Sequence, residues 1–378
     1  MKNYCLLFMF LSSFSYGQYE VVDNKMSQIP DSLTISTTKI ADFISNNFQT
    51  PNDKIRAVFI WTVNNISYDV VNMLNQDPTK SVEFRIKTAL ETKKGVCMHY
   101  AAVFNDIANK IGVRTYVIEG YTKQYGKIAT LGHAWCASQI DGKWFLFDPT
   151  WGSGYVLNEI YVKKINNSFF KAEPSKFILE HMPFDYLWQF LSPPVTNIEF
   201  NGGKNDPKKP NIICDFQVEI DRWEELSESD KDFEAAERIE KNGLYNKLIV
   251  EQYNLKKKNF SILIQNKNIN KLNSVVFNYN EAIGLLNDFS RFRFNKFKPE
   301  QSDELMQKNM QDLLDKINKC KEEVYNIGSV GPENTSNLVK LKKSILDAVD
   351  QSEKQKTFLD TYLSKESVGR KLMMSKYR

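Results

Sequence analysis

The sequence has few histidines, few cysteines and little net charge. Only three of its 378 residues are histidine, which excludes a protein with several histidine-rich metal sites. Its 50 Lys and Arg residues nearly balance 46 Asp and Glu residues, and the resulting net charge of +4 is too small to indicate nucleic-acid binding. The 42% of hydrophobic and 25% of charged residues are typical of a globular chain. Its length predicts two domains, or one large domain with a tail.

The first 17 residues are typical of a secretory signal peptide. Lys2 supplies a positive charge, residues 4–14 form an apolar run, and Ser15 and Gly17 place small residues two positions apart. This run is shorter than the roughly 20 residues that a membrane anchor needs, and no later stretch is apolar enough to cross a membrane. We therefore expect cleavage between Gly17 and Gln18 and export to the periplasm, the cell envelope or the medium.

Four cysteines remain after the predicted cleavage: Cys97, Cys136, Cys214 and Cys320. They are widely spaced and contain no CxxC pair, so the sequence has no zinc-binding cysteine motif. It also has no glycine-rich loop of the kind that binds phosphate, and we expect neither a metal nor a cofactor. A chain of this length does not depend on disulfides for its stability, so at least one cysteine can be present for its reactivity.

Apolar periodicity predicts a series of helices followed by strands. The predicted helices cover residues 36–48, 53–66, 81–92 and 97–111, and the predicted strands cover residues 114–121, 133–140 and 143–148. Asp141 and Gly142 lie between the last two strands and predict a two-residue hairpin turn. The expected fold class is α+β, with helices packed on an antiparallel sheet.

The composition changes after Pro193 and Pro194, and from about Asp221 onward the chain is predicted to be mainly helical. Apolar residues between Met306 and Val324 recur at a spacing of 4-3-4-3-4, and residues 338–348 repeat this spacing. The pattern predicts long antiparallel helices, although a coiled-coil arm for self-association fits it as well. The predicted divisions are residues 1–17 (signal peptide), 18–50 (N-terminal arm), 51–195 (core domain), 196–220 (linker, in which residues 212–220 could form a strand) and 221–378 (helical region).

Three residues form a candidate site for nucleophilic chemistry. Cys97 lies at the first turn of a predicted helix, where unpaired N–H groups and the helix dipole favour a thiolate. In the hairpin, Ile140 lies opposite Lys143, and continuing this register places His133 and Asp148 on one face, about 7 Å apart at the backbone. Asp148 can then orient the His133 ring so that its other nitrogen faces the thiol, whereas Cys136 points to the opposite face.

Each of these residues also has a structural interpretation. A cysteine at the start of a helix is often a small buried apolar residue, and a strand histidine is often a hydrogen-bonded core residue. Asp148, which precedes Pro149, can be a cap at the end of a strand. The catalytic interpretation is preferred because it explains why all three residue types occur together.

The motifs around these residues resemble those of the transglutaminase-like superfamily. They are Gly95-Val96-Cys97 with Tyr100-Ala101, Gly132-His133-Ala134-Trp135, and Trp144 to Trp151 with the central Phe147-Asp148-Pro149. Residues 53–69 resemble the helix that precedes these motifs. His181-Met182-Pro183 and Trp188-Gln189-Phe190-Leu191 resemble the tail of the branch named after kyphoscoliosis peptidase, so the resemblance covers roughly residues 50–195.

The resemblance implies a papain-like α+β fold with a triad formed by Cys97, His133 and Asp148. The implied activity is acyl transfer or hydrolysis at amide bonds of peptides or proteins, and the implied partner is such a substrate. Trp135, His99 and Trp151 are candidates for lining the substrate groove, and we expect only a structural role for His181. An alternative is a non-catalytic module that keeps this fold and binds a protein, with the C-terminal helices as a further surface for a partner or for self-association.

Overall fold

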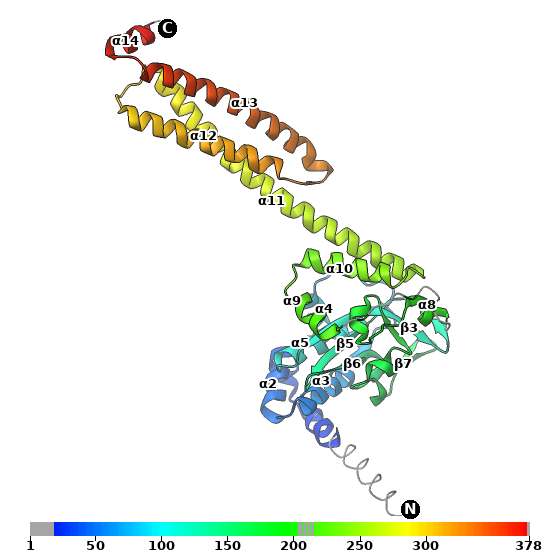
Figure 1. The fold of residues 1–378 in the computed structure, drawn as a ribbon. Helices are drawn as coiled ribbons and strands as arrows, with labels where there is room; N and C mark the ends of the chain where they lie inside the picture. Colours follow the sequence, from blue (N-terminus) through cyan, green and yellow to red (C-terminus); the bar gives the residue numbers. More distant parts are fainter. Residues whose placement is uncertain (1–18, 203–205, 207–208, 210–212, 214, 376–378) are drawn as a thin grey trace, which may run out of the picture. The chain divides into compact units, whose positions relative to one another are not determined.

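The computed structural model describes residues 19–202, 206, 209, 213 and 215–375, so the predicted signal peptide lies outside the described residues. The chain divides into two compact units (Figure 1). The N-terminal unit comprises Met1–Ser227 and Lys231–Lys256, and the C-terminal unit comprises Glu228–Asp230 and Lys257–Arg378. Within the part of the chain that is described, no helix combines the length and apolarity needed to cross a membrane.

A five-stranded antiparallel sheet forms the centre of the N-terminal unit. Strands β4 (Lys127–Ile128), β3 (Thr115–Gln124), β5 (His133–Ile140) and β6 (Lys143–Phe147) follow one another across it, and β9 (His181–Pro183) also pairs with β3. The predicted hairpin is confirmed, because Ile140 pairs with Lys143 and the register continues to Cys136 and Phe147. Asp141 and Gly142 in the turn both have positive φ, as a type I′ turn requires.

Four helices cover one face of this sheet and confirm the predicted helical segments. They are α2 (Thr37–Asn47), α3 (Pro51–Asn65), α4 (Val82–Thr92) and α5 (Cys97–Lys110). The side chain of Thr50 caps α3 by accepting the Asp53 N–H, and Ser81 caps α4 in the same way. Residues 18–50 were predicted to be a separate arm, but Ile40 and Ile44 are fully buried in the core that α3 and α5 share with the sheet.

The other face of the sheet carries an aromatic core that extends beyond the predicted boundary at residue 195. Helix α9 (Phe216–Glu224) lies where the strand was predicted, because Asp215 caps it by accepting the N–H groups of Gln217 and Val218. The strand prediction is therefore wrong for residues 216–220, whereas residues 212 and 214 lie outside the described part. Ile220 of α9 is fully buried beside Trp144, so α9 belongs to the core of the N-terminal unit.

Short elements connect these layers and complete the N-terminal unit. They are η1 (Asp31–Leu33), β1 (Ser67–Tyr68), β2 (Lys94–Gly95), α6 (Pro149–Ser153), β7 (Gly154–Leu157), β8 (Ile160–Lys163), η2 (Asn167–Phe169), α7 (Pro174–Phe177), η3 (Tyr186–Gln189), α8 (Asn197–Gly202) and α10 (Glu228–Lys241), whose first three residues belong to the C-terminal unit. Strands β1 and β2 pair in parallel, and β7 and β8 form a hairpin.

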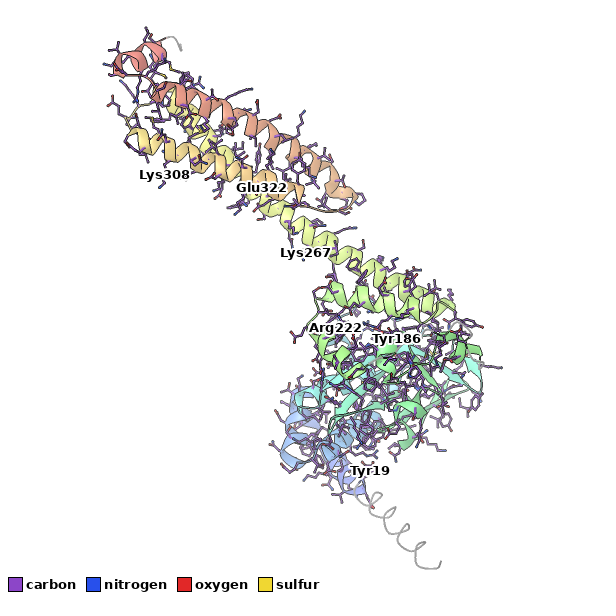
Figure 2. All side chains as sticks on the ribbon, in the orientation of Figure 1. Tyr19, Tyr186, Arg222, Lys267, Lys308 and Glu322 are labelled. Carbon is purple, nitrogen blue, oxygen red and sulfur yellow. The ribbon has the colours of Figure 1, made fainter. Side chains whose placement is uncertain are left out.

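The C-terminal unit is helical, as predicted. It contains the part of α11 (Lys247–Phe294) from Lys257 onward, with α12 (Asp303–Tyr325), α13 (Pro332–Leu363) and α14 (Ser367–Ser375). All predicted stripe positions are buried: Met306, Met310, Leu313, Ile317, Cys320 and Val324 on α12, and Leu338, Leu341, Ile345 and Ala348 on α13. Lys267, Lys308 and Glu322 lie on the exposed faces of these helices (Figure 2). The apolar spacing therefore marks the core of a helical unit.

Candidate active site

Cys97 is the first residue of α5, and the backbone before it is held tightly. Pairing of β1 with β2 places Tyr68 beside Gly95, two residues before the cysteine. A Cβ atom on Gly95 would lie 2.4 Å from Cβ of His99, so only glycine fits there. The Val96 N–H donates to Nδ1 of His99 at 3.2 Å, and His99 is only 6% exposed. His99 is therefore a helix cap, which corrects its prediction as a residue of the substrate groove.

A chain of hydroxyl groups anchors the first turn of α5 to its neighbours. The Tyr100 hydroxyl donates to the backbone carbonyl of Ile66 at 2.7 Å. The Ser153 hydroxyl donates to the Tyr100 oxygen, and the Tyr161 hydroxyl reaches both the carbonyl and the hydroxyl of Ser153. Burial raises the pKa of Tyr100 far above its usual range, so this hydroxyl stays protonated and the anchor persists.

His133 is the first residue of β5 and lies between a carboxylate and the thiol. Its Nε2 is 2.8 Å from Oδ2 of Asp148, which is the hydrogen bond that the hairpin register predicted. The Cys97 thiol lies close enough to the His133 ring to contribute to the raised pKa of His133. Because Nε2 is bound to Asp148, Nδ1 is the ring nitrogen that remains for the thiol. Cys97 is half-buried, so a reactant can reach the sulfur.

Asp148 is completely buried, and its two oxygens perform different tasks. Oδ1 accepts the backbone N–H groups of Thr150 and Trp151 at 2.8 and 3.0 Å, which makes Asp148 the N-cap of α6. Oδ2 accepts from His133 at 2.8 Å and from Nε2 of His181 at 3.0 Å. The capping interpretation and the histidine-orienting interpretation of Asp148 are thus satisfied together by one carboxylate.

We expected only a structural role for His181, but its Nε2 lies 3.0 Å from the Asp148 oxygen that also binds His133. Strand β9 brings it to Asp148 because Gly120 of β3 pairs with His133 on one side and with Pro183 on the other. A Cβ atom on Gly120 would lie 2.2 Å from the Met182 carbonyl oxygen, so this close approach requires glycine. A glycine inside a predicted strand is a sequence signal for such an approach, but it does not say which segment approaches.

The buried site contains one ion pair and one neutral histidine. Burial disfavours the charged form of His133, but the charge and hydrogen bond of Asp148, with a contribution from Cys97, raise the pKa of His133 to about 10. Burial opposes ionisation of Asp148, yet His133 and His181 together hold the pKa of its carboxyl well below the usual range. For His181 burial dominates and lowers its pKa to about 4. At neutral pH His133 and Asp148 are therefore charged and His181 is not.

The remaining residues around the site divide into core and cleft positions. Trp135 is only 1% exposed, so it is a core residue. Its prediction as a residue of the substrate groove is therefore wrong. Trp151 is half-buried with its ring centroid 5.6 Å from that of His133, and it remains a groove candidate. Burial and the nearby charges of Cys97 and Asp148 raise the pKa of Tyr68 to about 12, so its hydroxyl stays protonated beside the thiol. Sequence analysis had not selected Tyr68 as a site residue.

The other cysteines occupy different surroundings. Among the described cysteines, Cys97, Cys136 and Cys320 are all free thiols, and Cys214 lies outside the described residues. Cys136 is fully buried and donates to the Ala101 carbonyl, on the opposite side of the sheet from Trp135, as the alternation of the strand predicted. Burial raises the pKa of Cys136 well above its usual range, which makes it a poor nucleophile.

His133, Asp148 and His181 also offer three ligand atoms within 4.8 Å of one another. Both histidine nitrogens, however, are directed at the same carboxylate oxygen, at hydrogen-bond distance. A metal ion between them would replace two short hydrogen bonds that already satisfy these buried groups. The arrangement therefore favours acid–base chemistry at the thiol over metal binding.

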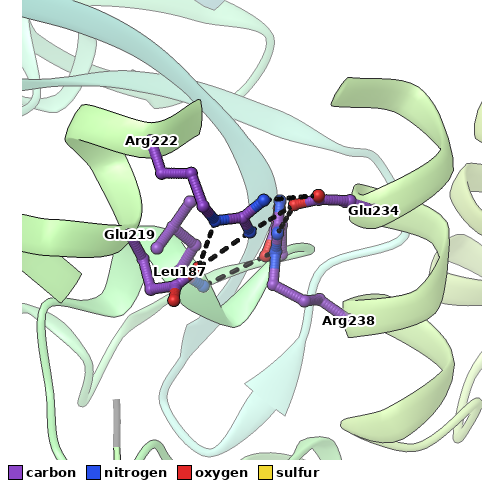
Figure 3. Close-up of polar contacts among 6 residues, drawn as sticks. Leu187, Glu219, Arg222, Glu234 and Arg238 are labelled. Atoms are coloured by element: carbon purple, nitrogen blue, oxygen red, sulfur yellow. Dashed lines mark hydrogen bonds and ion pairs between the residues drawn. The ribbon is translucent and has the colours of Figure 1, made fainter. Parts of the chain in front are cut away.

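A cavity of about 720 Å³ lies elsewhere in the N-terminal unit, and its lining includes no residue of the site described above. Arg222 of α9, which lines this cavity, binds both Glu219 and Glu234 (Figure 3). Arg238 of α10 binds Asp185 through two hydrogen bonds of 2.7 and 2.8 Å. Each arginine is paired with carboxylates of neighbouring elements, so we interpret the network as a link between α9, α10 and η3.

Comparison with known proteins agrees with this geometry. Residues 38–149 match the family model of the transglutaminase-like superfamily, so the chain carries a transglutaminase-like domain, and this region includes Cys97, His133 and Asp148. The kyphoscoliosis peptidase of Homo sapiens is 29% identical over 199 residues, which are 50% of this chain and 29% of that protein. Hillarin of Drosophila melanogaster is 23% identical over 206 residues, 48% of this chain and 24% of that protein.

The chain therefore spans less than a third of the length of each of these relatives. A solved structure of a TGase matches with a TM-score of 0.26 and 18% identity, covering 42% of this chain and 41% of that one. The observed architecture is a curled antiparallel sheet with helices, followed by a helical C-terminal region, in agreement with the predicted fold class.

Proposed function

We propose that this protein is a cysteine enzyme that transfers acyl groups at amide bonds of peptides or proteins. The observation that carries the proposal is the position of the His133 ring: it is bound to the Asp148 carboxylate at 2.8 Å and lies close enough to the Cys97 thiol for that thiol to raise its pKa. The thiol lies at the N-terminus of α5, and the buried carboxylate holds Nε2 of the base, which leaves Nδ1 for the thiol. This is the arrangement of nucleophile, base and orienting group that acyl transfer requires.

The proposed reaction proceeds through a thioester on Cys97. The thiolate sulfur attacks the amide carbonyl carbon, and the backbone N–H of Cys97, at the start of α5, supplies part of the oxyanion hole that stabilises the oxyanion. His133 then donates its Nδ1 proton to the nitrogen of the leaving amine as the C–N bond breaks. Water or a second amine attacks the thioester, His133 accepts the proton of that nucleophile, and the thiolate leaves.

The choice of the second nucleophile decides between a peptidase and a transglutaminase. The test is to incubate the protein with a peptide library, with and without an added primary amine, and to identify products by mass spectrometry. New peptide ends indicate hydrolysis, and amine-linked peptides indicate transamidation. The proposal requires that Cys97→Ala abolish both kinds of product. Products formed equally well by this variant would contradict it, and a protein partner bound equally by both forms without any product would favour a non-catalytic binding module.

We propose further that the protein acts outside the cytoplasm. The support is the charged start, apolar run and small-residue cleavage pattern of residues 1–17. Mass spectrometry of the protein purified from its native cells should find a chain that begins at Gln18. A chain that retains residues 1–17 in the cytoplasmic fraction would contradict this proposal.

A further inference from the structure

We propose that His181 is a positioning residue for the chemistry at Cys97, an inference that rests on the proposed function. It donates its Nε2–H to the same Asp148 oxygen that receives His133, and so fixes the carboxylate to which the base is bound. His181 touches neither the thiol nor the reacting atoms, and therefore acts only through Asp148 and His133.

The first support is the complete set of partners around the carboxylate. Two backbone N–H groups hold Oδ1, and two histidine rings reach Oδ2 at 2.8 and 3.0 Å. A carboxylate oxygen has two lone pairs and can accept both ring N–H groups. With both oxygens held, the Asp148 carboxylate cannot turn about its Cβ–Cγ bond. His133 is then bound to an acceptor of fixed direction, and this direction sets where its Nδ1 points.

The second support is the other nitrogen of His181. Its Nδ1 is buried and has no hydrogen-bond partner among the residues that the structure describes. The proton is therefore best placed on Nε2, where Asp148 accepts it, and the low pKa of His181 agrees with a neutral ring. A ring that served only packing would lose nothing as phenylalanine, and would leave no buried nitrogen without a partner. The hydrogen bond that Nε2–H donates to Asp148 therefore explains why this position has an imidazole and not a phenyl ring.

The third support is that aromatic neighbours hold the His181 ring in place. Phe177 stacks on it with a centroid distance of 4.0 Å, and Trp151 and Trp135 approach at 4.5 and 5.2 Å. The side chain is 1% exposed, so water does not replace the bond to Asp148. A donor held this rigidly supplies direction as well as a hydrogen bond, which is what a positioning residue must do.

The test measures how fast iodoacetamide alkylates Cys97 in the full-length protein, from about pH 5 to pH 9, by mass spectrometry of the Cys97 peptide. His181→Phe keeps the ring shape and removes the donor. His181→Gln places an amide nitrogen near the position of Nε2, whereas the shorter His181→Asn cannot reach Asp148. Phe190→Leu is the packing control, because Phe190 belongs to the same aromatic core and stacks on Trp144.

We expect His181→Phe and His181→Asn to slow alkylation at neutral pH by about ten-fold or more, as is typical when the partner of a functional group is lost. The loss should be greatest on the acid side of the pH profile, where reactivity depends on the charged His133. His181→Gln should stay within about three-fold of the wild-type rate, and Phe190→Leu should lower the melting temperature without changing the profile.

Equal profiles for wild type and a folded His181→Phe would overturn the inference. If that variant does not fold, equal rates for the His181→Asn and His181→Gln proteins would do the same. The proposed function is tested separately by including His133→Ala. Wild-type alkylation no faster than that of His133→Ala would refute the proposed function, whereas a fast wild type with an unaffected His181→Phe would refute only the role of His181.

Discussion

Replacing Asp148 with asparagine keeps the size of the side chain but turns one acceptor oxygen into an amide nitrogen. The remaining oxygen can still accept the N–H groups of Thr150 and Trp151, so the cap of α6 survives. The amide nitrogen then faces Nε2 of both His133 and His181, and its two hydrogens can be donated only to unprotonated nitrogens. We therefore expect both rings to become neutral Nδ1–H tautomers, so that His133 loses its positive charge and its Nε2 proton.

The energetic cost of this substitution follows from the ion pair that is lost. The rise in the pKa of His133 from its ordinary 6.5 to about 10 corresponds to roughly 5 kcal/mol. Removing one partner of a buried ion pair typically costs about 3–5 kcal/mol, and the two figures describe the same interaction. We expect Asp148→Asn to lower the free energy of unfolding in urea by about 3–5 kcal/mol at the pH where the loss is greatest.

The loss should depend on pH in a defined direction. The raised pKa of His133 contributes stability that is complete below its unfolded value of 6.5 and disappears as the pH rises through about 10. The lowered pKa of Asp148 contributes stability above its unfolded value of 3.8, which disappears as the pH falls through its folded value. The difference between wild type and Asp148→Asn should therefore be greatest between about pH 4 and pH 6.5 and smallest near pH 10.

NMR of the protein labelled with ¹⁵N-histidine can read the tautomers directly. The chain has only three histidines, and the third, His99, accepts a hydrogen bond at Nδ1 from the Val96 N–H and serves as an internal control. In the wild type we expect a charged His133 and a neutral His181 protonated at Nε2. An unchanged spectrum in Asp148→Asn, or a loss of stability below about 1 kcal/mol at pH 6, would refute the reasoning.

Three further predictions concern the frame around the site. Gly120→Ala places a Cβ atom 2.2 Å from the Met182 carbonyl oxygen, so it should lower the free energy of unfolding in urea by at least about 1–3 kcal/mol. In the control Gly132→Ala the nearest atom to the new Cβ is 3.6 Å away, and the free energy of unfolding should change little. Arg238→Met leaves the buried Asp185 without the two hydrogen bonds and the positive charge of Arg238, and should cost about 3–5 kcal/mol, with Arg238→Lys intermediate. Equal stability of the three proteins would contradict this. A chain that ends at Pro194 lacks α9 and should fail to give a cooperative melting transition, because Ile220 is fully buried in the aromatic core; a sharp transition would show that this core forms without α9.

The parts of the site that depend on local geometry could be predicted from the sequence. A two-residue turn fixes the register of its hairpin, so the positions of His133 and Asp148 followed from Asp141 and Gly142. His181 could not be predicted in this way, because its contact with Asp148 spans 33 residues and depends on how β9 docks on β3. Pairing between distant strands leaves no periodic signal in the sequence.

The error at residues 216–220 has a different cause, because the signal was present. Asp215 is a good N-cap, and Phe216, Ile220 and Trp223 follow at helical spacing. The burial of Trp135 and His99 was not accessible from the sequence, since a residue near the end of a strand or helix can face either a cleft or the core. The buried stripes of the C-terminal unit were predicted correctly because their spacing repeats over several turns.

The central claim is that His133 activates Cys97 as a nucleophile. The most direct measurement is the rate of iodoacetamide labelling at each cysteine of the native protein at pH 7, resolved by peptide mass spectrometry, in the wild type and in His133→Ala. The account predicts that Cys97 is labelled at least about ten times faster than Cys136, Cys214 and Cys320, and that the excess disappears in His133→Ala. Similar rates at all four cysteines, or an excess at Cys97 that persists without His133, would contradict it.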